Sequence, residues 1–169
     1  MTLEQPLATR PPRSLAEAAE AHLDDVFGYL LYLTRDRETA EDLSSATFEK
    51  ALRMWDRFDP RRGSARTWLL GIARSTALDW FRAEARRRKR EAAAARDERV
   101  EEAFVEGLSP ELETALTSLT AGEREVLALR IVLELDGDAA ARVLGISPTA
   151  VSTRLSRALK RLEERVNEG

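Results

Sequence analysis

Residues 136–162, with the sequence DGDAAARVLGISPTAVSTRLSRALKRL, decide the fold. Asp136 can cap a short helix, and Gly145 can take the left-handed conformation that ends it. Pro148 favours the start of a second helix, because proline suits the first helical position. Two helices joined by a three-residue turn that contains glycine form a helix-turn-helix. The sequence therefore predicts a helix-turn-helix here.

The second helix of this motif has two different faces. One arc is apolar and predicts the buried side: Val151, Leu155, Ala158, Leu159 and Leu162. Small hydroxyl side chains let a helix approach the major groove closely, and arginines bind phosphates or guanine edges. The residues predicted to bind duplex DNA occupy the other face and its flanks: Thr149, Ser152, Thr153, Arg154, Ser156, Arg157, Lys160 and Arg161. An ordinary helical hairpin with a solvated basic face remains the alternative.

Charge is unevenly distributed along the chain, which has 169 residues and a formal net charge of −3. Residues 53–90 contain 12 Lys or Arg against 4 Asp or Glu, and residues 142–165 contain 6 against 2. The rest of the chain is strongly acidic. Two basic stretches on an acidic chain are expected of a protein that places two separate surfaces on a polyanion such as nucleic acid.

Composition excludes several kinds of chemistry. There is no cysteine, which rules out disulfides, cysteine-ligated zinc and thiol catalysis. His22 is the only histidine and is predicted to lie on a helix surface or partly buried. No apolar run approaches the roughly 20 residues that span a bilayer, and the start of the sequence lacks a signal-peptide pattern. We expect a cytoplasmic protein that is not an enzyme and needs no cofactor or metal.

Capping residues and apolar periodicity predict helices throughout, with no strand pattern. They cover about 14–33, 36–55, 64–96, a helix from 109–110, 120–133, 136–144 and a last helix from 147–148. The prediction is an all-α protein of two small helical domains joined by a flexible linker. Its parts are a disordered tail at 1–13, a first domain at 14–96, an acidic linker at 97–108 and a second domain at 109–169. Trp68 and Trp80 are expected to pack in the core of the first domain.

Several segments resemble regions 2 and 4 of bacterial sigma factors. Those similar to region 2 are 40–43 (AEDL), 47–48 (TF), 58–60 (FDP), 62–64 (RGS), 67–69 (TWL) and 71–74 (GIAR). Those similar to region 4 are 124–127 (REVL), 144–147 (LGIS) and 151–158 (VSTRLSRA). The resemblance covers about residues 15–165 in the family's order. The subtype that it resembles is the extracytoplasmic-function (ECF, group 4) subfamily, whose members have only these two regions.

This resemblance implies a subunit that binds RNA polymerase core and directs it to promoters. Region 4 would read the −35 element as duplex, and region 2 would recognise and help melt the −10 element. Opening DNA costs roughly 1.4 kcal/mol per stacked step. A pocket for an unstacked base and a basic groove for the displaced strand can offset that cost.

The resemblance also assigns residues. It places the −10 pocket in the loop 56–66 and predicts these contacts to the −10 region: Arg61, Arg62, Ser64, Arg66, Ser75, Arg82, Arg86 and Arg87. It places the contact with the clamp of the polymerase's largest subunit on the second helix, at Glu41, Asp42, Leu43 and Phe48. An anti-sigma factor is an expected further partner.

Two other readings remain open from the residues alone. One is a one-component transcription regulator that has a ligand-binding or dimerisation domain before the helix-turn-helix. The other is a helical enzyme, which the lack of cysteine, a histidine pair and a glycine-rich phosphate loop makes a poor fit.

Overall fold

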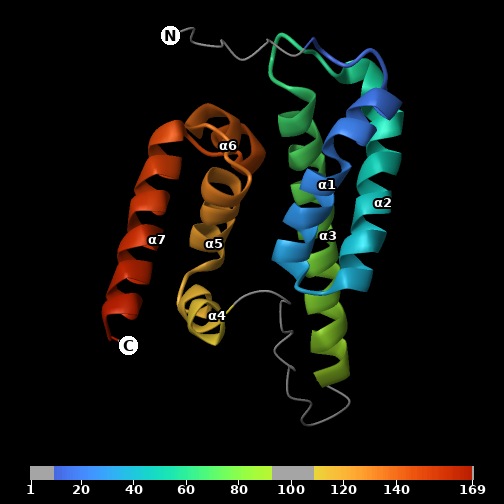
Figure 1. Cartoon of the computed structure of the whole chain (residues 1–169). Coiled ribbons are helices and arrows are strands. Elements are labelled where there is room, and N and C mark those ends of the chain that lie inside the picture. Colours follow the sequence, from blue (N-terminus) through green and yellow to red (C-terminus); the bar gives the residue numbers. More distant parts are fainter. Residues whose placement is uncertain (1–9, 93–108, 169) are drawn as a thin grey trace, which may run out of the picture.

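A computed structural model of the chain describes residues 10–92 and 109–168, and every regular element in these two ranges is a helix (Figure 1). The predicted all-α class is therefore confirmed. The predicted linker at 97–108 and most of the predicted tail at 1–13 lie outside the described residues.

The first unit contains three long helices and one short 3₁₀ turn. In chain order these are α1 (Leu15–Thr34), α2 (Arg37–Met54), η1 (Trp55–Arg57) and α3 (Ala65–Ala92). Each helix start is capped as the sequence predicts, because Ser14, Asp36 and Ser64 accept hydrogen bonds from backbone amides three residues on. The spacing of Ser14 and Glu17 predicts a capping box, but only the bond from the Glu17 amide to the Ser14 hydroxyl forms. The carboxylate of Glu17 accepts from the backbone amide of Arg13 at 2.9 Å instead.

The core of this unit is built from the predicted helical stripes. Leu30, Leu69 and Leu70 are completely buried between the three helices. Thr47 and Thr76 are also buried, and each hydroxyl donates to the backbone carbonyl four residues earlier. These bonds satisfy the two hydroxyls inside the helices, so threonine can occupy core positions here.

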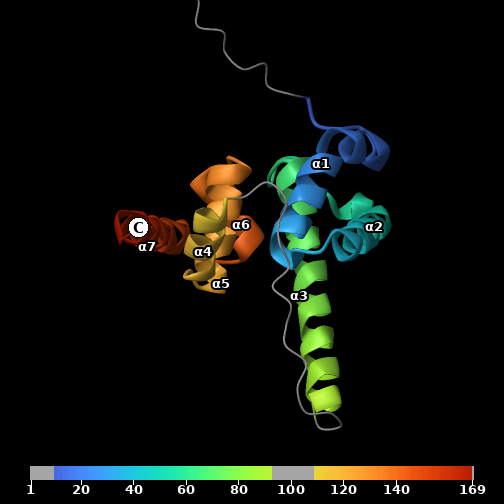
Figure 2. The ribbon, with the colours of Figure 1, turned by 60° about the horizontal axis from the view of Figure 1, so that its bottom comes forward.

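The long third helix leaves the core partway along its length. Its apolar stripe ends near Trp80, and the residues from Arg82 onward are mostly exposed. Figure 2 shows the C-terminal part of α3 projecting beyond α1 and α2. A helix that loses its apolar stripe has no core to bury against, so this projection follows from the sequence.

The second unit contains the predicted helix-turn-helix. Its elements are α4 (Pro110–Thr117), α5 (Ala121–Leu127), a π-helical turn η2 (Ala128–Val132), α6 (Gly137–Leu144) and α7 (Pro148–Glu168). Thr120 and Glu123 have the three-residue spacing of a capping box and form one, in which each side chain accepts from the other's backbone amide. Gly145 has φ +66° after α6, as the turn requires.

The two units lie against each other. A continuous cluster of buried apolar residues extends from α1–α3 to α5 and α6 and includes Val126, Leu129 and Leu133. A smaller cluster joins α4, α5 and α7 through Leu116, Leu127 and Ala158. Helix α6 contacts α3, and α7 lies on the side of the second unit away from α1–α3 (Figures 1 and 2).

Candidate nucleic-acid interface

Helix α7 presents the predicted duplex-binding face to solvent. Val151 and Ala158 are completely buried and set the rotation of the helix about its axis. The opposite side is exposed, and six of the eight predicted residues lie there: Thr149, Ser152, Thr153, Ser156, Arg157 and Lys160. The hydroxyl of Thr153 donates to the carbonyl of Thr149 at 3.0 Å, which fixes its orientation on the first turns.

The other two predicted residues turn toward α5. Arg161 lies 3.6 Å from the carboxylate of Glu123, whose side chain is only 6% exposed. The guanidinium of Arg154 lies over Gly122, with Nη1 at 3.3 Å from the place that a β-carbon there would take. Both arginines therefore lie on the flank of α7 that faces α5, and their role in DNA binding stays a prediction.

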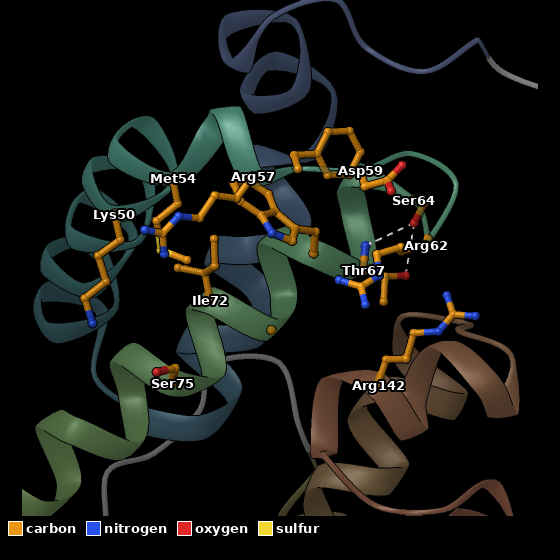
Figure 3. Close-up of a pocket in the computed structure, with 14 residues that line it drawn as sticks. Lys50, Met54, Arg57, Asp59, Arg62, Ser64, Thr67, Ile72, Ser75 and Arg142 are labelled. Atoms are coloured by element: carbon orange, nitrogen blue, oxygen red, sulfur yellow. Dashed lines mark hydrogen bonds between the residues drawn. The ribbon is translucent and has the colours of Figure 1, made fainter.

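A cavity of 480 Å³ lies beside the loop that precedes α3 (Figure 3). Three of the predicted −10 residues line it: Arg62, Ser64 and Ser75. Beneath the loop, Trp55, Phe58 and Trp68 form an aromatic cluster with ring centroids 5.0–5.8 Å apart. Trp68 is half-buried and both packs in this cluster and lines the cavity. An aromatic wall beside basic side chains is the combination that holds an unstacked base and its phosphate.

The cavity also contains basic residues that sequence reasoning did not assign. Lys50 enters from α2 and Arg57 from η1, while Arg142 reaches in from α6 of the other unit (Figure 3). Arg57 belongs to the basic stretch 53–90, so the charge pattern of the sequence could have indicated it as a nucleic-acid contact. Arg142 belongs to the other basic stretch, 142–165, but its place in this cavity depends on how the two units pack and could not be predicted.

The remaining predicted −10 residues lie around the cavity rather than in it. Arg61 is bound by Asp59 at 3.1 Å, and the hydrogen bonds from Arg61 lower the pKa of that carboxyl. Arg66 donates to Asp25 at 2.6 Å and to the backbone carbonyl of Leu133, so it lies in the contact between the two units.

The basic end of α3 lies further along the same helix. Arg82, Arg86 and Arg87 are exposed there, and Arg87 pairs with Glu84 and Glu91 at 2.8 and 3.1 Å. Exposed pairs of this kind contribute little stability, so phosphates can replace the carboxylates. This end of α3 can therefore bind a nucleic-acid backbone.

The predicted polymerase contact lies on the outer face of α2. Glu41 and Asp42 are exposed and Phe48 is half-buried. Leu43 is 7% exposed and packs in the core, so it holds α2 against the other helices and is not part of the exposed face. Leu52, which the sequence places beside the apolar stripe of this helix, is 68% exposed; it follows Glu41 by eleven residues, about three turns, and so lies on the same side of the helix.

Two further features bear on the kind of site present. Among the described residues, no group of His, Cys, Asp and Glu side chains is arranged to hold a metal ion. In the same part of the chain, no helix combines the length and apolar character needed to cross a membrane.

Comparison with known proteins agrees with this geometry. Residues 18–87 match the family described as sigma-70 region 2, and residues 109–162 match sigma-70, region 4. ECF RNA polymerase sigma factor SigC of Mycobacterium tuberculosis is 35% identical over 150 residues, which cover 86% of this chain and 80% of SigC. The ECF sigma factor SigX of Bacillus subtilis is 30% identical over 155 residues, which cover 86% and 79% of the two chains.

Solved structures are similar over nearly the whole chain. The sigma factor RpoE from Bartonella quintana, in complex with the anti-sigma factor NepR, has a TM-score of 0.69 at 25% identity and covers 90% of this chain and 96% of its own. CnrH, in complex with the cytosolic domain of CnrY, has a TM-score of 0.66 at 25% identity, with 92% and 89% covered. Since both sigma-70 regions match in order and relatives at 30–35% identity extend over most of their own length, the chain belongs to the ECF family of RNA polymerase sigma factors.

Proposed function

We propose that this sigma factor binds RNA polymerase core and directs it to promoters with two elements, reading the −35 element with α7 and recognising and melting the −10 element with the first unit. One observation supports this most strongly. The exposed hydroxyl and basic face of α7 belongs to the second unit, whereas the basic, aromatic-walled cavity is lined mainly by the first unit, so each can take a different part of one promoter.

The chemistry of each surface suits its element. A helix with short hydroxyl side chains and flanking cations fits the major groove of duplex DNA. A cavity with an aromatic wall and cationic side chains suits a single unstacked base. The exposed arginines at the end of α3 suit the duplex backbone just upstream of the melted bases.

The exposed acidic face of α2 is the proposed contact with the polymerase clamp. Glu41 and Asp42 carry the charge at its start, and Phe48 adds an apolar edge. The carboxylate of Glu41 accepts from Nε of Arg37 at 3.2 Å, an exposed pair that contributes little stability and that a cationic side chain of a partner can replace. In this role the protein supplies specificity and DNA strand separation, and the polymerase supplies all covalent chemistry.

An anti-sigma factor is the proposed regulatory partner, because RpoE of Bartonella quintana is seen in complex with one. We also assign the chain to group 4 and to the cytoplasm, where bacterial polymerase acts. Purification of the tagged protein from its native cells should yield both polymerase and a second stoichiometric protein. Recovery of polymerase alone under every growth condition would remove the anti-sigma assignment.

A binding experiment tests the proposed function. A promoter fragment that carries both elements is mixed with the purified protein, with core polymerase, or with both. We expect a sequence-specific complex only when both are present. Tight specific binding by the protein alone would identify a one-component regulator instead.

A further inference from the structure

A second cavity, of 670 Å³, adjoins the 480 Å³ cavity beside the loop that precedes α3. We call the 480 Å³ cavity the first cavity. Phe58, Arg62 and Gly63 line both, so the two cavities are neighbours along this loop. Further walls of the second cavity come from α1 and from the residues before it, beginning at Arg10. Sites that hold small organic groups have volumes of about 300–1,000 Å³, so the second cavity has room for one nucleotide.

Arginine side chains dominate the charge of the second cavity. Against one acidic residue, Glu17, it is lined by five arginines: Arg10, Arg61, Arg62, Arg66 and Arg142. Arg61 and Arg66 are paired with aspartates that do not line the cavity, whereas Arg62 and Arg142 are exposed. Like charges gathered in one place favour a bound anion, and phosphate is the anion that each nucleotide of a strand carries.

Apolar rings line the same cavity. Phe58 and Pro60 belong to the loop, and Pro11 and Pro12 precede α1. Aromatic rings stack on bases without regard to their sequence, and the flat faces of proline rings add apolar surface beside them. The cavity therefore combines cations for a phosphate with ring surfaces for a base or a sugar.

The residues before α1 are held at the cavity by Glu17. Its carboxylate accepts from the backbone amide of Arg13 at 2.9 Å and from Nη2 of Arg10 at 3.5 Å. The bond from the Arg13 amide lowers the pKa of this carboxyl. With the chain turned in this way, Arg10, Pro11 and Pro12 line the cavity, and Arg13 does not. The pair of Arg10 and Glu17 is exposed and weak, so a phosphate can replace the carboxylate on Arg10.

The single histidine of the sequence also lines this cavity. His22 is half-buried on α1, in keeping with its predicted position, and burial lowers its pKa. A neutral imidazole keeps one N–H group that it can donate. His22 therefore adds a hydrogen-bond donor to the cations of the cavity.

We propose that the second cavity binds the nucleotide next to the unstacked base, with Arg10 and Arg62 as ligands of its phosphate. The strand of the −10 element then continues from the first cavity past Gly63 toward α1. Because Gly63 has no side chain and lines both cavities, a strand can pass close to the loop there. The inference rests on the proposed function, since it extends the same single strand, and it gives the residues before α1 a role in promoter binding.

A series of strand lengths tests this inference on the holoenzyme. Fluorescent single-stranded oligonucleotides carry the −10 sequence of a promoter that the holoenzyme uses. They end either at that element or two nucleotides beyond it, at one end or the other. We expect extension at one of the two ends to raise the affinity of the parent holoenzyme. Arg10→Ala should reduce that gain by about two- to fivefold, the worth of one exposed ion pair, and leave the affinity for the short strand unchanged.

Arg13→Ala is the matched control, because it removes the same charge from an exposed side chain that does not line the cavity. It should keep the full gain, and Arg10→Lys should keep most of it. Salt dependence gives a second readout. For the long strand, the slope of log affinity against log salt concentration should become shallower by about 0.7 in Arg10→Ala, the value for one phosphate of a single strand. Equal losses in Arg10→Ala and Arg13→Ala would reveal only a general effect of charge and overturn the inference.

The outcomes separate this inference from the proposed function. Strand binding with the same gain in the parent and in Arg10→Ala would overturn the second site and leave the role of the first cavity intact. No binding of the −10 strand by the parent holoenzyme at any length would count against the proposed function itself. A free nucleotide has the same chemistry, so a fluorescent adenosine triphosphate analogue is titrated into the free protein. Binding of this analogue that Arg10→Ala abolishes would identify a small-molecule site and overturn the assignment to the strand.

Discussion

Arginines on the same helix have different roles, which depend on the residues that face them. Arg157 points to solvent, whereas Arg161 lies 3.6 Å from the almost fully buried carboxylate of Glu123. The helical period of α7 was sufficient to predict its exposed face. Val151 and Ala158 are seven residues, about two turns, apart, so they lie on the same side of the helix, and both are buried. The inward orientation of Arg154 and Arg161 could not be predicted, because it depends on Gly122 and Glu123 in a separate helix.

Arg157→Ala should weaken promoter use through the −35 element by about 1–3 kcal/mol, the worth of one good arginine contact. Binding to core polymerase should be unchanged, because Arg157 belongs to α7, which lies on the other side of the molecule from α2 (Figure 1). Competition between promoters with intact and mutated −35 elements measures the effect. An equal loss of core affinity would contradict the assignment.

Arg161→Ala provides the matched contrast. It removes the partner of a buried carboxylate, so the free energy of unfolding should fall by about 0.5–1 kcal/mol, a modest loss because the arginine is half exposed. Its effect on −35 recognition should be smaller than that of Arg157→Ala. Thermal unfolding measures the loss of stability in both variants, and promoter competition measures their −35 recognition. A larger loss of −35 recognition in Arg161→Ala than in Arg157→Ala would show that Arg161 is the DNA contact.

Helix boundaries were predictable because capping chemistry is local. Ser14, Asp36, Ser64 and Thr120 all accept the expected backbone amides, since each bond joins residues only three apart. The π-helical turn after α5 was not anticipated, because the sequence 128–132 continues an ordinary helical pattern. Its contact partners in α1 come from the other unit.

Thr120→Ala should test the contribution of the capping box at α5. Loss of a cap costs about 1 kcal/mol, so the transition temperature should fall by about 2–4 °C. Thr114→Ala is the control, because that hydroxyl bonds only within α4 and caps nothing. An equal shift in both variants would show that the capping bonds contribute no special stability.

The proposed polymerase contact on the outer face of α2 can be tested by mutation. The double change Glu41→Ala and Asp42→Ala should lower affinity for core polymerase by about tenfold or more, as loss of charged contacts at an interface does. Binding of the −10 oligonucleotide by the free protein should not change. Ser45→Ala on the same exposed face is the control. Unchanged core affinity in the double variant would remove these residues from the interface.

At the scale of the whole molecule, the two basic surfaces were predictable and their mutual arrangement was not. Charge along the chain and the order of the motifs indicated two DNA-facing parts. The contact between them depends on Tyr29 and Arg74, which lie 96 and 51 residues before Glu125 and share no periodic pattern with it. Each looks like an ordinary surface or core residue by itself. Only the packed structure shows that one carboxylate joins the two units.

The central claim is that this chain selects where a bacterial polymerase starts transcription. The most direct test is in vitro transcription of a genomic library by purified core polymerase, with and without the protein, followed by mapping of the 5′ ends. We expect a set of start sites that appears only when the protein is added, each preceded by the same pair of sequence elements. The same 5′ ends in both reactions would contradict the account.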